Sequence, residues 1–172
     1  MQIAYAANRL HLLPGRFGSR PRSSARLPFR QLDQFPPADI HRRLAQLSLD
    51  LPHVKARQSR VAAPDSIALI VDDAVAAGPA EAFIDGHEFC HLHPQPEGSV
   101  HLILPPSMIE AVLALGWAER HPAHQLGIMN TLVMVYAPRD ECELNVILTL
   151  IECARQFAMG ASAGVAITRS VA

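Results

Sequence analysis

The chain has 172 residues, which is long enough for one domain with a hydrophobic core and too short for two full ones. Hydrophobic residues make up 49% of the chain, charged residues make up 18%, and the formal net charge is −1. These values are typical of a soluble globular protein and argue against a disordered chain, a membrane protein or a nucleic-acid-binding protein.

The N-terminal segment differs from the rest of the chain in charge. Residues 1–30 contain several arginines and no acidic residue, and prolines and glycines interrupt residues 11–30. This segment resembles a transit peptide, but arginine is frequent along the whole chain, which favours a plain tail. We expect residues 1–33 to be a flexible tail, residues 34–160 to form one domain and residues 161–172 to be a second flexible tail. The cysteines show no C-x-x-C spacing, which favours a reducing compartment, and we expect a cytoplasmic protein.

The first expected elements follow two prolines. Ile40, Leu44 and Leu47 are spaced at i, i+4 and i+7, which predicts the apolar face of a short helix that ends before Pro52. Residues 66–73, SIALIVDD, form a short apolar and β-branched run, which predicts a strand.

Two further strands are expected in residues 79–94 and 98–105, joined by a loop that contains prolines and a glycine. A capping box of Ser107 with Glu110 predicts that a helix begins there, and Gly116 is suited to the left-handed residue after its end.

Residues 130–138, NTLVMVYAP, predict the next strand. A looser capping box of Asp140 with Glu143 opens the last expected helix, which ends near Gly160. Its apolar stripe consists of Leu144, Ile147, Leu148 and Ile151. The order of elements predicts an α+β fold of two layers, with a mostly antiparallel sheet and helices on one face.

Histidines are concentrated in the expected pair of strands. Side chains alternate between the two faces of a strand, so His91 and His93 point to one face and Leu92 points to the other. A register that pairs Leu92 with Val100 sets His91 across from His101. Strict alternation predicts a histidine face of Phe89, His91, His93, Ser99 and His101, and an opposite face of Glu88, Cys90, Leu92, Val100, Leu102 and Leu104.

Three interpretations of the histidine face remain open. His91, His93 and His101 are sufficient to bind one zinc or iron ion with an open position. They are also suited to metal-free acid and base catalysis, and they are compatible with a purely structural role. We therefore expect either no cofactor or a single histidine-bound metal ion. Ser99 lacks a nucleophile motif, and no glycine-rich phosphate loop is present in the sequence.

A second group of polar and aromatic residues lies in residues 116–122, GWAERHP, which we expect to be a loop. Trp117 beside Glu119 and His121 is typical of a small-molecule pocket with a stacking wall and polar anchors. The structural alternative is that Trp117 closes the core and Glu119 pairs with an arginine. Arg139 precedes a helix and either binds an anion or pairs with Glu119.

Together, the stretches EFCHLHPQPEGSVHLILPP, GWAERHP and VYAPRDECEL resemble the luciferase-domain family, small bacterial and fungal proteins named for the fungal luciferase. The resemblance covers residues 54–160. Cys90 stands where the family has alanine, and Ala118 stands where it has glycine. The matching polar and aromatic positions are Glu88, His91, His93, Ser99, His101, Trp117, Glu119, His121 and Arg139.

The resemblance carries an expectation about activity. The fungal luciferase oxidises a hydroxypyrone luciferin with molecular oxygen, without an evident organic cofactor, and is membrane-associated. The resemblance therefore implies an oxygenase-like enzyme acting on an enolic or phenolic small molecule. Unlike the fungal luciferase, this sequence has no apolar run long enough for a membrane helix and no basic stripe, so we expect no membrane or nucleic-acid partner. The alternative is a non-catalytic ligand- or metal-binding accessory domain. The implied roles are catalysis for His91, His101, Glu119 and His121, and substrate binding for Glu88, Ser99, Trp117 and Arg139. The candidate metal ligands, His91, His93 and His101, follow from the chemistry of the histidine face and not from the resemblance.

Overall fold

Six strands form one antiparallel sheet in the computed structural model, which describes residues 13–161. The strands follow the order β1-β2-β3-β4-β6-β5 across the sheet, and every neighbouring pair is antiparallel. The strands are β1 (Val54–Gln58), β2 (Ile67–Val71), β3 (Glu88–Leu92), β4 (Val100–Ile103), β5 (Ala118–Arg120) and β6 (Leu132–Val135).

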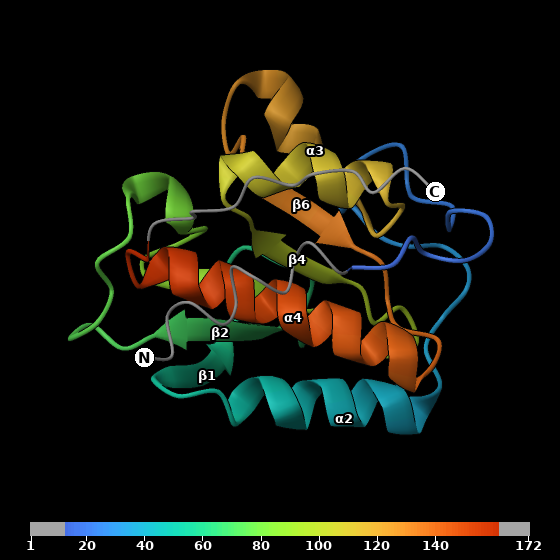
Figure 1. The fold of residues 1–172 in the computed structure, drawn as a ribbon, viewed down its shortest axis with the longest axis horizontal. Coiled ribbons are helices and arrows are strands. Elements are labelled where there is room, and N and C mark those ends of the chain that lie inside the picture. Colours follow the sequence, from blue (N-terminus) through green and yellow to red (C-terminus); the bar gives the residue numbers. More distant parts are fainter. Residues whose placement is uncertain (1–12, 162–172) are drawn as a thin grey trace.

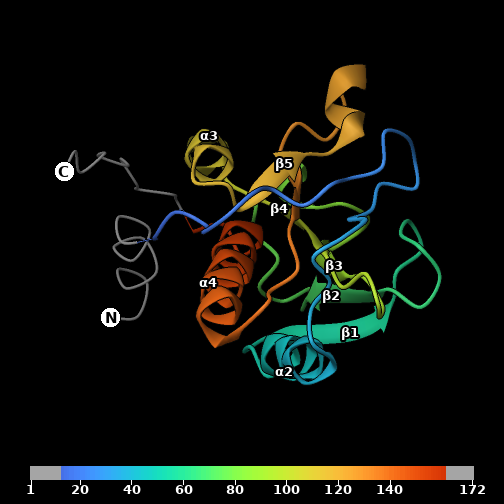
Figure 2. The ribbon, with the colours of Figure 1, turned by 90° about the vertical axis from the view of Figure 1, so that its right-hand side faces the viewer.

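Three α-helices cover one face of this sheet, as Figures 1 and 2 show from two directions: α2 (Ala38–Leu49), α3 (Pro106–Ala114) and α4 (Glu141–Ala158). Apolar side chains of the helices and the sheet form the main core between the two layers. This arrangement confirms the α+β fold that the sequence predicted. No helix within residues 13–161 has both the length and the hydropathy needed to cross a membrane.

The central helix α4 begins where the sequence predicted. The side chain of Asp140 accepts a hydrogen bond from the backbone N–H of Glu143 at 2.9 Å, which caps the helix. Leu144, Ile147 and Ile151 are fully buried against the sheet. The apolar stripe of this helix therefore positions it over the middle strands, on the face opposite the histidines.

The predicted capping box of α3 is wrong. This helix starts at Pro106, its N-cap is Pro105, and no side chain caps it. Proline at the first helical position has a suitable φ and no N–H to satisfy, so Ser107 is not needed as a cap. Glu110 instead forms an ion pair with Arg120. Gly116 has a φ of 80°, as expected for the residue after the helix.

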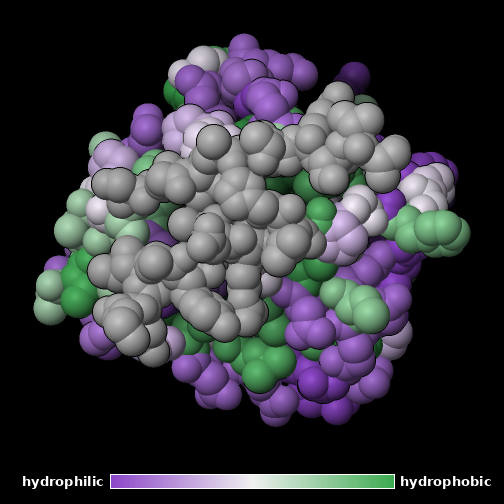
Figure 3. Space-filling model, viewed as in Figure 1, coloured by the Kyte–Doolittle hydropathy of each residue, from purple (hydrophilic) through white to green (hydrophobic). Residues whose placement is uncertain are grey.

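The buried face of α2 is also slightly different from the prediction. Ile40 and Leu44 are buried, but the third buried residue is Ser48, whose hydroxyl donates to the carbonyl of Leu44. Leu47 is 39% exposed. The outer surface of α2, at the bottom of Figure 3, carries mostly hydrophilic residues.

Residues 116–122, expected to be a loop, contain the edge strand β5. Ala118 pairs with Val135, and the backbone N–H of His121 donates a hydrogen bond to the carbonyl of Leu132. The sequence pattern did not predict this strand because its side chains are largely polar. An edge strand tolerates polar residues on its open face.

The second face of the sheet is covered by chain without helices, as Figure 2 shows for the N-terminal segment in blue. Within residues 13–33, which we expected to be part of a flexible tail, Phe29 and Gln31 are buried. The Gln31 amide oxygen accepts the backbone N–H of Ala137 at 2.8 Å, which ties the segment to the sheet. Residues 1–12 and 162–172 lie outside the described residues.

Candidate functional site

The hairpin of β3 and β4 has the predicted register. Leu92 pairs with Val100, His91 pairs with His101, and the backbone N–H of His93 donates to the carbonyl of Ser99 at 2.9 Å. Because one face must be buried under the helices, this register directs the three imidazoles to the opposite face.

Strict alternation fails at the start of β3. Glu88 and Cys90 pair with consecutive residues of β2, so Phe89 is an extra residue that forms a β-bulge. Phe89 and Cys90 both belong to the core under the helices. Glu88 is consequently moved to the same face as His91. The prediction that Phe89 lies on the histidine face and Glu88 on the opposite face is wrong for this reason.

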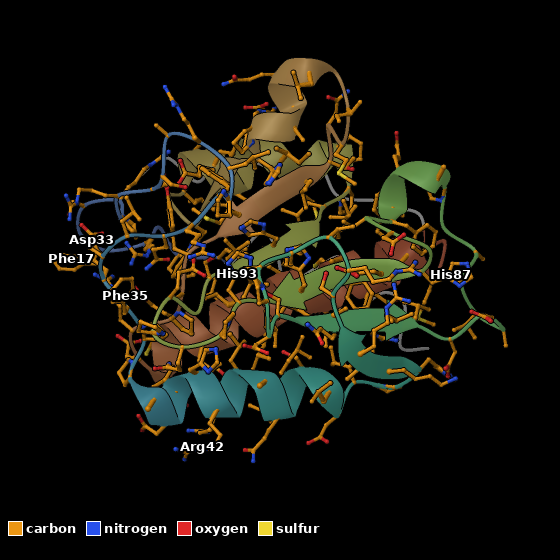
Figure 4. All side chains as sticks on the ribbon, turned by 180° about the vertical axis from the view of Figure 1, so that it is seen from behind. Phe17, Asp33, Phe35, Arg42, His87 and His93 are labelled. Carbon is orange, nitrogen blue, oxygen red and sulfur yellow. The ribbon has the colours of Figure 1, made fainter. Side chains whose placement is uncertain are left out.

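His91, His93 and His101 form a tight cluster in the interior. The ring centroids of His93 and His101 are 4.4 Å apart, and those of His91 and His101 are 5.0 Å apart. Each residue is no more than 4% exposed. One ring nitrogen from each histidine lies within 4.8 Å of the other two. Figure 4 looks onto this face, where His93 lies near the centre and His87 lies far to one side.

A buried carboxylate orients the first histidine. The Nδ1 atom of His91 lies 2.8 Å from Oε1 of Glu88, which also accepts the hydroxyl of Ser59 at 2.9 Å. The other oxygen of Glu88 lies 3.8 Å from the guanidinium of Arg57. Ser59 and Arg57 are site residues that the sequence did not indicate, because they belong to another part of the chain.

A second carboxylate orients His93. Its Nδ1 atom lies 2.5 Å from Oε2 of Glu97, whose Oε1 accepts the backbone N–H of Gln31 at 2.9 Å. Burial acts to raise the pKa of Glu97, but the hydrogen bond with His93 helps to bring the net pKa below its usual value. The sequence analysis missed Glu97 as a site residue, although its i+4 spacing from His93 across a turn is a usable signal.

These contacts determine which ring nitrogens are free. Since the Nδ1 atoms of His91 and His93 face carboxylates, they carry the hydrogen and leave a lone pair on Nε2. The Nε2 atoms of His91, His93 and His101 are buried and have no hydrogen-bond partner within residues 13–161. Burial and the neighbouring histidines lower the pKa of His101 well below its usual value, which favours its neutral form.

His121 is adjacent to the three-histidine cluster but carries its hydrogen on the other ring nitrogen. Its Nδ1 atom accepts the backbone N–H of Ala123 at 3.2 Å, as the N-cap of the 3-10 helix η3 (Pro122–Leu126). A neutral imidazole that accepts at Nδ1 carries its hydrogen on Nε2. Burial and the nearby histidines lower the pKa of His121 to about 4. His121 is therefore a neutral hydrogen-bond donor beside the cluster.

The four histidines line one cavity of about 570 Å³. Its other walls are mainly apolar and come from the N-terminal segment, the β1–β2 loop and the segments that lead into β3 and β6. They consist of Leu27, Pro28, Phe29, Arg30, Val61, Ala62, Ala63, Pro64, Ile84, Met129 and Leu132. Phe29 contacts the rings of His101 and His121, with centroids 6.0 and 5.5 Å away, and it supplies the aromatic wall.

Glu119 and Ser99 lie on the same side of the sheet without lining the cavity. Met134 pairs with both His101 and Glu119, so it separates the acid from the cluster by one strand. Burial raises the pKa of Glu119. Ser99 is fully buried at the turn end of β4.

Trp117 and Arg139 are not brought together with the histidines. They line a different cavity of about 430 Å³ near the N-terminus of α4. The indole N–H of Trp117 donates to the carbonyl of Pro14 at 2.7 Å, and Arg139 forms an ion pair with Glu143 rather than with Glu119. The expectation that Trp117 is the stacking wall of the histidine pocket is thus corrected, since Phe29 has that position.

Comparisons with known proteins agree with the expected resemblance. The family model described as "Luciferase domain" matches residues 86–154. Luciferases of Armillaria gallica and Armillaria ostoyae are each 32% identical over 83 residues, which is 46% of this chain and 31% of theirs. The luciferase of Armillaria mellea is 28% identical over 171 residues, covering 88% of this chain and 63% of that protein. The chain thus spans less than two thirds of the length of these relatives, and no solved structure matches it.

Proposed function

The chain belongs to the luciferase-domain family through residues 86–154, and from this premise we propose that it is an oxygenase-like enzyme acting on an enolic or phenolic small molecule. The observation that carries the proposal is the gathering of three buried imidazoles, with free Nε2 atoms, on the wall of a mainly apolar cavity. A volume of about 570 Å³ is in the usual range for small organic ligands.

The proposed chemistry needs a proton acceptor and molecular oxygen. The substrate hydroxyl transfers its proton to an Nε2 lone pair of the cluster, which leaves an electron-rich enolate or phenolate. A carbon of this anion forms a bond to O2, which takes up two electrons from the substrate. The proton then returns to the distal oxygen, so that the product is a hydroperoxide and the histidine is restored.

Two further groups support this assignment. The Nε2–H of His121 is directed by its capping role to donate rather than accept, which suits stabilisation of the substrate oxyanion. Phe29 and the aliphatic walls suit a planar ring and keep bulk water from the anion.

The test is oxygen uptake by the purified chain with a panel of hydroxypyrones and catechols. We expect substrate-dependent uptake, and about a hundredfold loss of kcat/KM in His91→Gln and His101→Gln, in line with the usual contribution of a general base. His87→Gln is the matched control, because His87 pairs with Asp73 outside the cavity and should keep full activity. Tight binding of these compounds without oxygen uptake would instead favour the non-catalytic ligand-binding alternative.

A further inference from the structure

The three free Nε2 atoms have a second consequence, which deepens the proposed function and rests on the same cavity. We infer that His91, His93 and His101 are the ligands of one divalent first-row transition metal ion. The cluster therefore has a cofactor, which composition and family resemblance leave unassigned.

The first support is the state of the ligand atoms. Each of the three histidines is more than nine-tenths buried, and its Nε2 atom has no hydrogen-bond partner among the described residues. A buried polar atom without a partner is destabilising, so a common partner for the three atoms would remove three such penalties together. One ring nitrogen from each histidine lies within 4.8 Å of the other two. Ligands of a tetrahedral ion at bond lengths near 2 Å are about 3.3 Å apart, so small ring rotations are enough to close the site.

The second support is the pair of carboxylates behind the rings. Glu88 and Glu97 contact the Nδ1 atoms of His91 and His93, which is the arrangement that orients metal-binding histidines and makes them more basic. Within residues 13–161, the ion pairs of Glu97 involve only His93. Glu88 is fully buried and Glu97 is half-buried, so a divalent cation would balance their negative charge, with Arg57 assisting at Glu88.

The third support is the contrast with His121. Its ring centroid is only 5.4 Å from that of His101, yet its Nδ1 atom accepts a backbone N–H and its Nε2 atom carries the hydrogen. His121 is thus excluded from the ligand set while it caps η3. Three protein ligands would leave an open position, as in catalytic metal sites, and the cavity that the three histidines line would give a substrate access to it.

The ion changes how the substrate loses its proton. With the Nε2 lone pairs on the metal, the ring nitrogens would no longer accept the substrate proton, and the cation would instead favour the anionic form of the substrate hydroxyl, because a cation lowers the pKa of nearby oxygen groups. The proton of that hydroxyl goes to solvent. An all-imidazole site suits zinc, iron, copper or nickel, of which iron and copper are able to exchange electrons with oxygen.

The experiment uses the full, untagged chain, stripped with a chelator and titrated with Zn(II) against a chromophoric competitor. We expect one equivalent of Zn(II) per chain and a higher midpoint of thermal unfolding. His93→Gln and His101→Gln should lose this binding, and Glu97→Gln should weaken it by about 10- to 100-fold. The matched variants His121→Gln and His87→Gln should retain one equivalent at unchanged affinity.

The possible outcomes distinguish failure of the proposed metal site from failure of the proposed oxygenase activity. If wild-type protein binds no Zn(II) at micromolar concentration, or if His121→Gln loses the ion as His101→Gln does, the ligand set is overturned, whether or not other variants fold. Oxygen uptake by fully stripped protein would overturn the role of the ion in the reaction while leaving the proposed function standing. One bound equivalent, with no uptake after loading with Fe(II) or Cu(II), would support the metal site and contradict the proposed activity.

Discussion

The Nδ1 atom of His93 lies 2.5 Å from Oε2 of Glu97, across the turn that joins β3 to β4. The second oxygen of Glu97 accepts the backbone N–H of Gln31, which is 66 residues away in the sequence. One carboxylate therefore connects the orientation of a cavity histidine to the position of the N-terminal segment that covers the cavity.

Replacing Glu97 by Gln removes the charge and preserves the shape. We expect Glu97→Gln to lower the free energy of unfolding by about 1–3 kcal/mol, because a buried charge-assisted contact with His93 is lost. Urea unfolding at neutral pH measures this change. Glu110→Gln is the control, since Glu110 is mostly exposed and its ion pair with Arg120 should contribute about 0–1 kcal/mol. Equal losses in the two variants would contradict a special role for Glu97.

The turn that carries Glu97 depends on close packing at Gly98. This glycine has a φ of 65°, and a Cβ atom there would lie 2.6 Å from Cγ of Pro36. Gly86 has a φ of 59°, with no described atom within 4 Å of an added Cβ. Both alanine variants should lose about 1–2 kcal/mol from the left-handed backbone, and only Gly98→Ala should lose more through the clash. Denaturant unfolding of the pair tests this, and a Gly86→Ala loss as large as that of Gly98→Ala would refute it.

Phe29 should stabilise the domain as well as line the cavity. It is buried in a small cluster with Met134 and Tyr136 on the histidine face of the sheet. We expect Phe29→Ala to cost about 3 kcal/mol of unfolding free energy, as other large-to-small changes at buried phenylalanines do. Phe17→Ala should have an effect below about 0.5 kcal/mol, because Phe17 is 88% exposed. A flexible, unpacked segment would instead give no difference between these two variants in thermal unfolding.

The three thiols should differ in reactivity toward a disulfide reagent. Cys142 is exposed, whereas Cys90 and Cys153 are buried. Burial raises the pKa of Cys153 to about 12 and raises that of Cys90 well above its usual value, so neither forms thiolate near pH 8. One thiol should react quickly in the native protein and three in denaturant. Rapid reaction of two or more native thiols would show that the core opens easily.

The histidine hairpin was predictable because its geometry is local. The alternation of side chains along a strand and the need to bury one apolar face are sufficient to pair Leu92 with Val100 and to gather the three histidines. The cap of α4 was predictable for the same reason, since Asp140 and the N–H of Glu143 are separated by one turn.

The wrong predictions have identifiable physical causes. The bulge at Phe89 inserts one residue into β3. No short-range sequence pattern predicts this bulge, so strict alternation placed Glu88 on the wrong face. Pro106 begins α3 without a side-chain cap, which made the Ser107 box misleading. The strand β5 exists because β6 offers it a hydrogen-bonding edge, and its own residues do not favour a strand.

The sequence by itself determined the three helices, the strands β2, β3, β4 and β6, and the gathering of the three histidines on one face, because these depend on the fixed periods of helix and strand. The tertiary structure alone decided that Glu88 and Glu97 orient those histidines, that Phe29 rather than Trp117 forms the aromatic wall, and that His121 donates where its neighbours accept. The Phe29 contact joins segments far apart in the chain, whose approach is set by long-range packing. The contacts of Glu88, Glu97 and His121 are local in sequence, but they depend on a bulge, a turn and a helix cap that the periods of helix and strand do not specify.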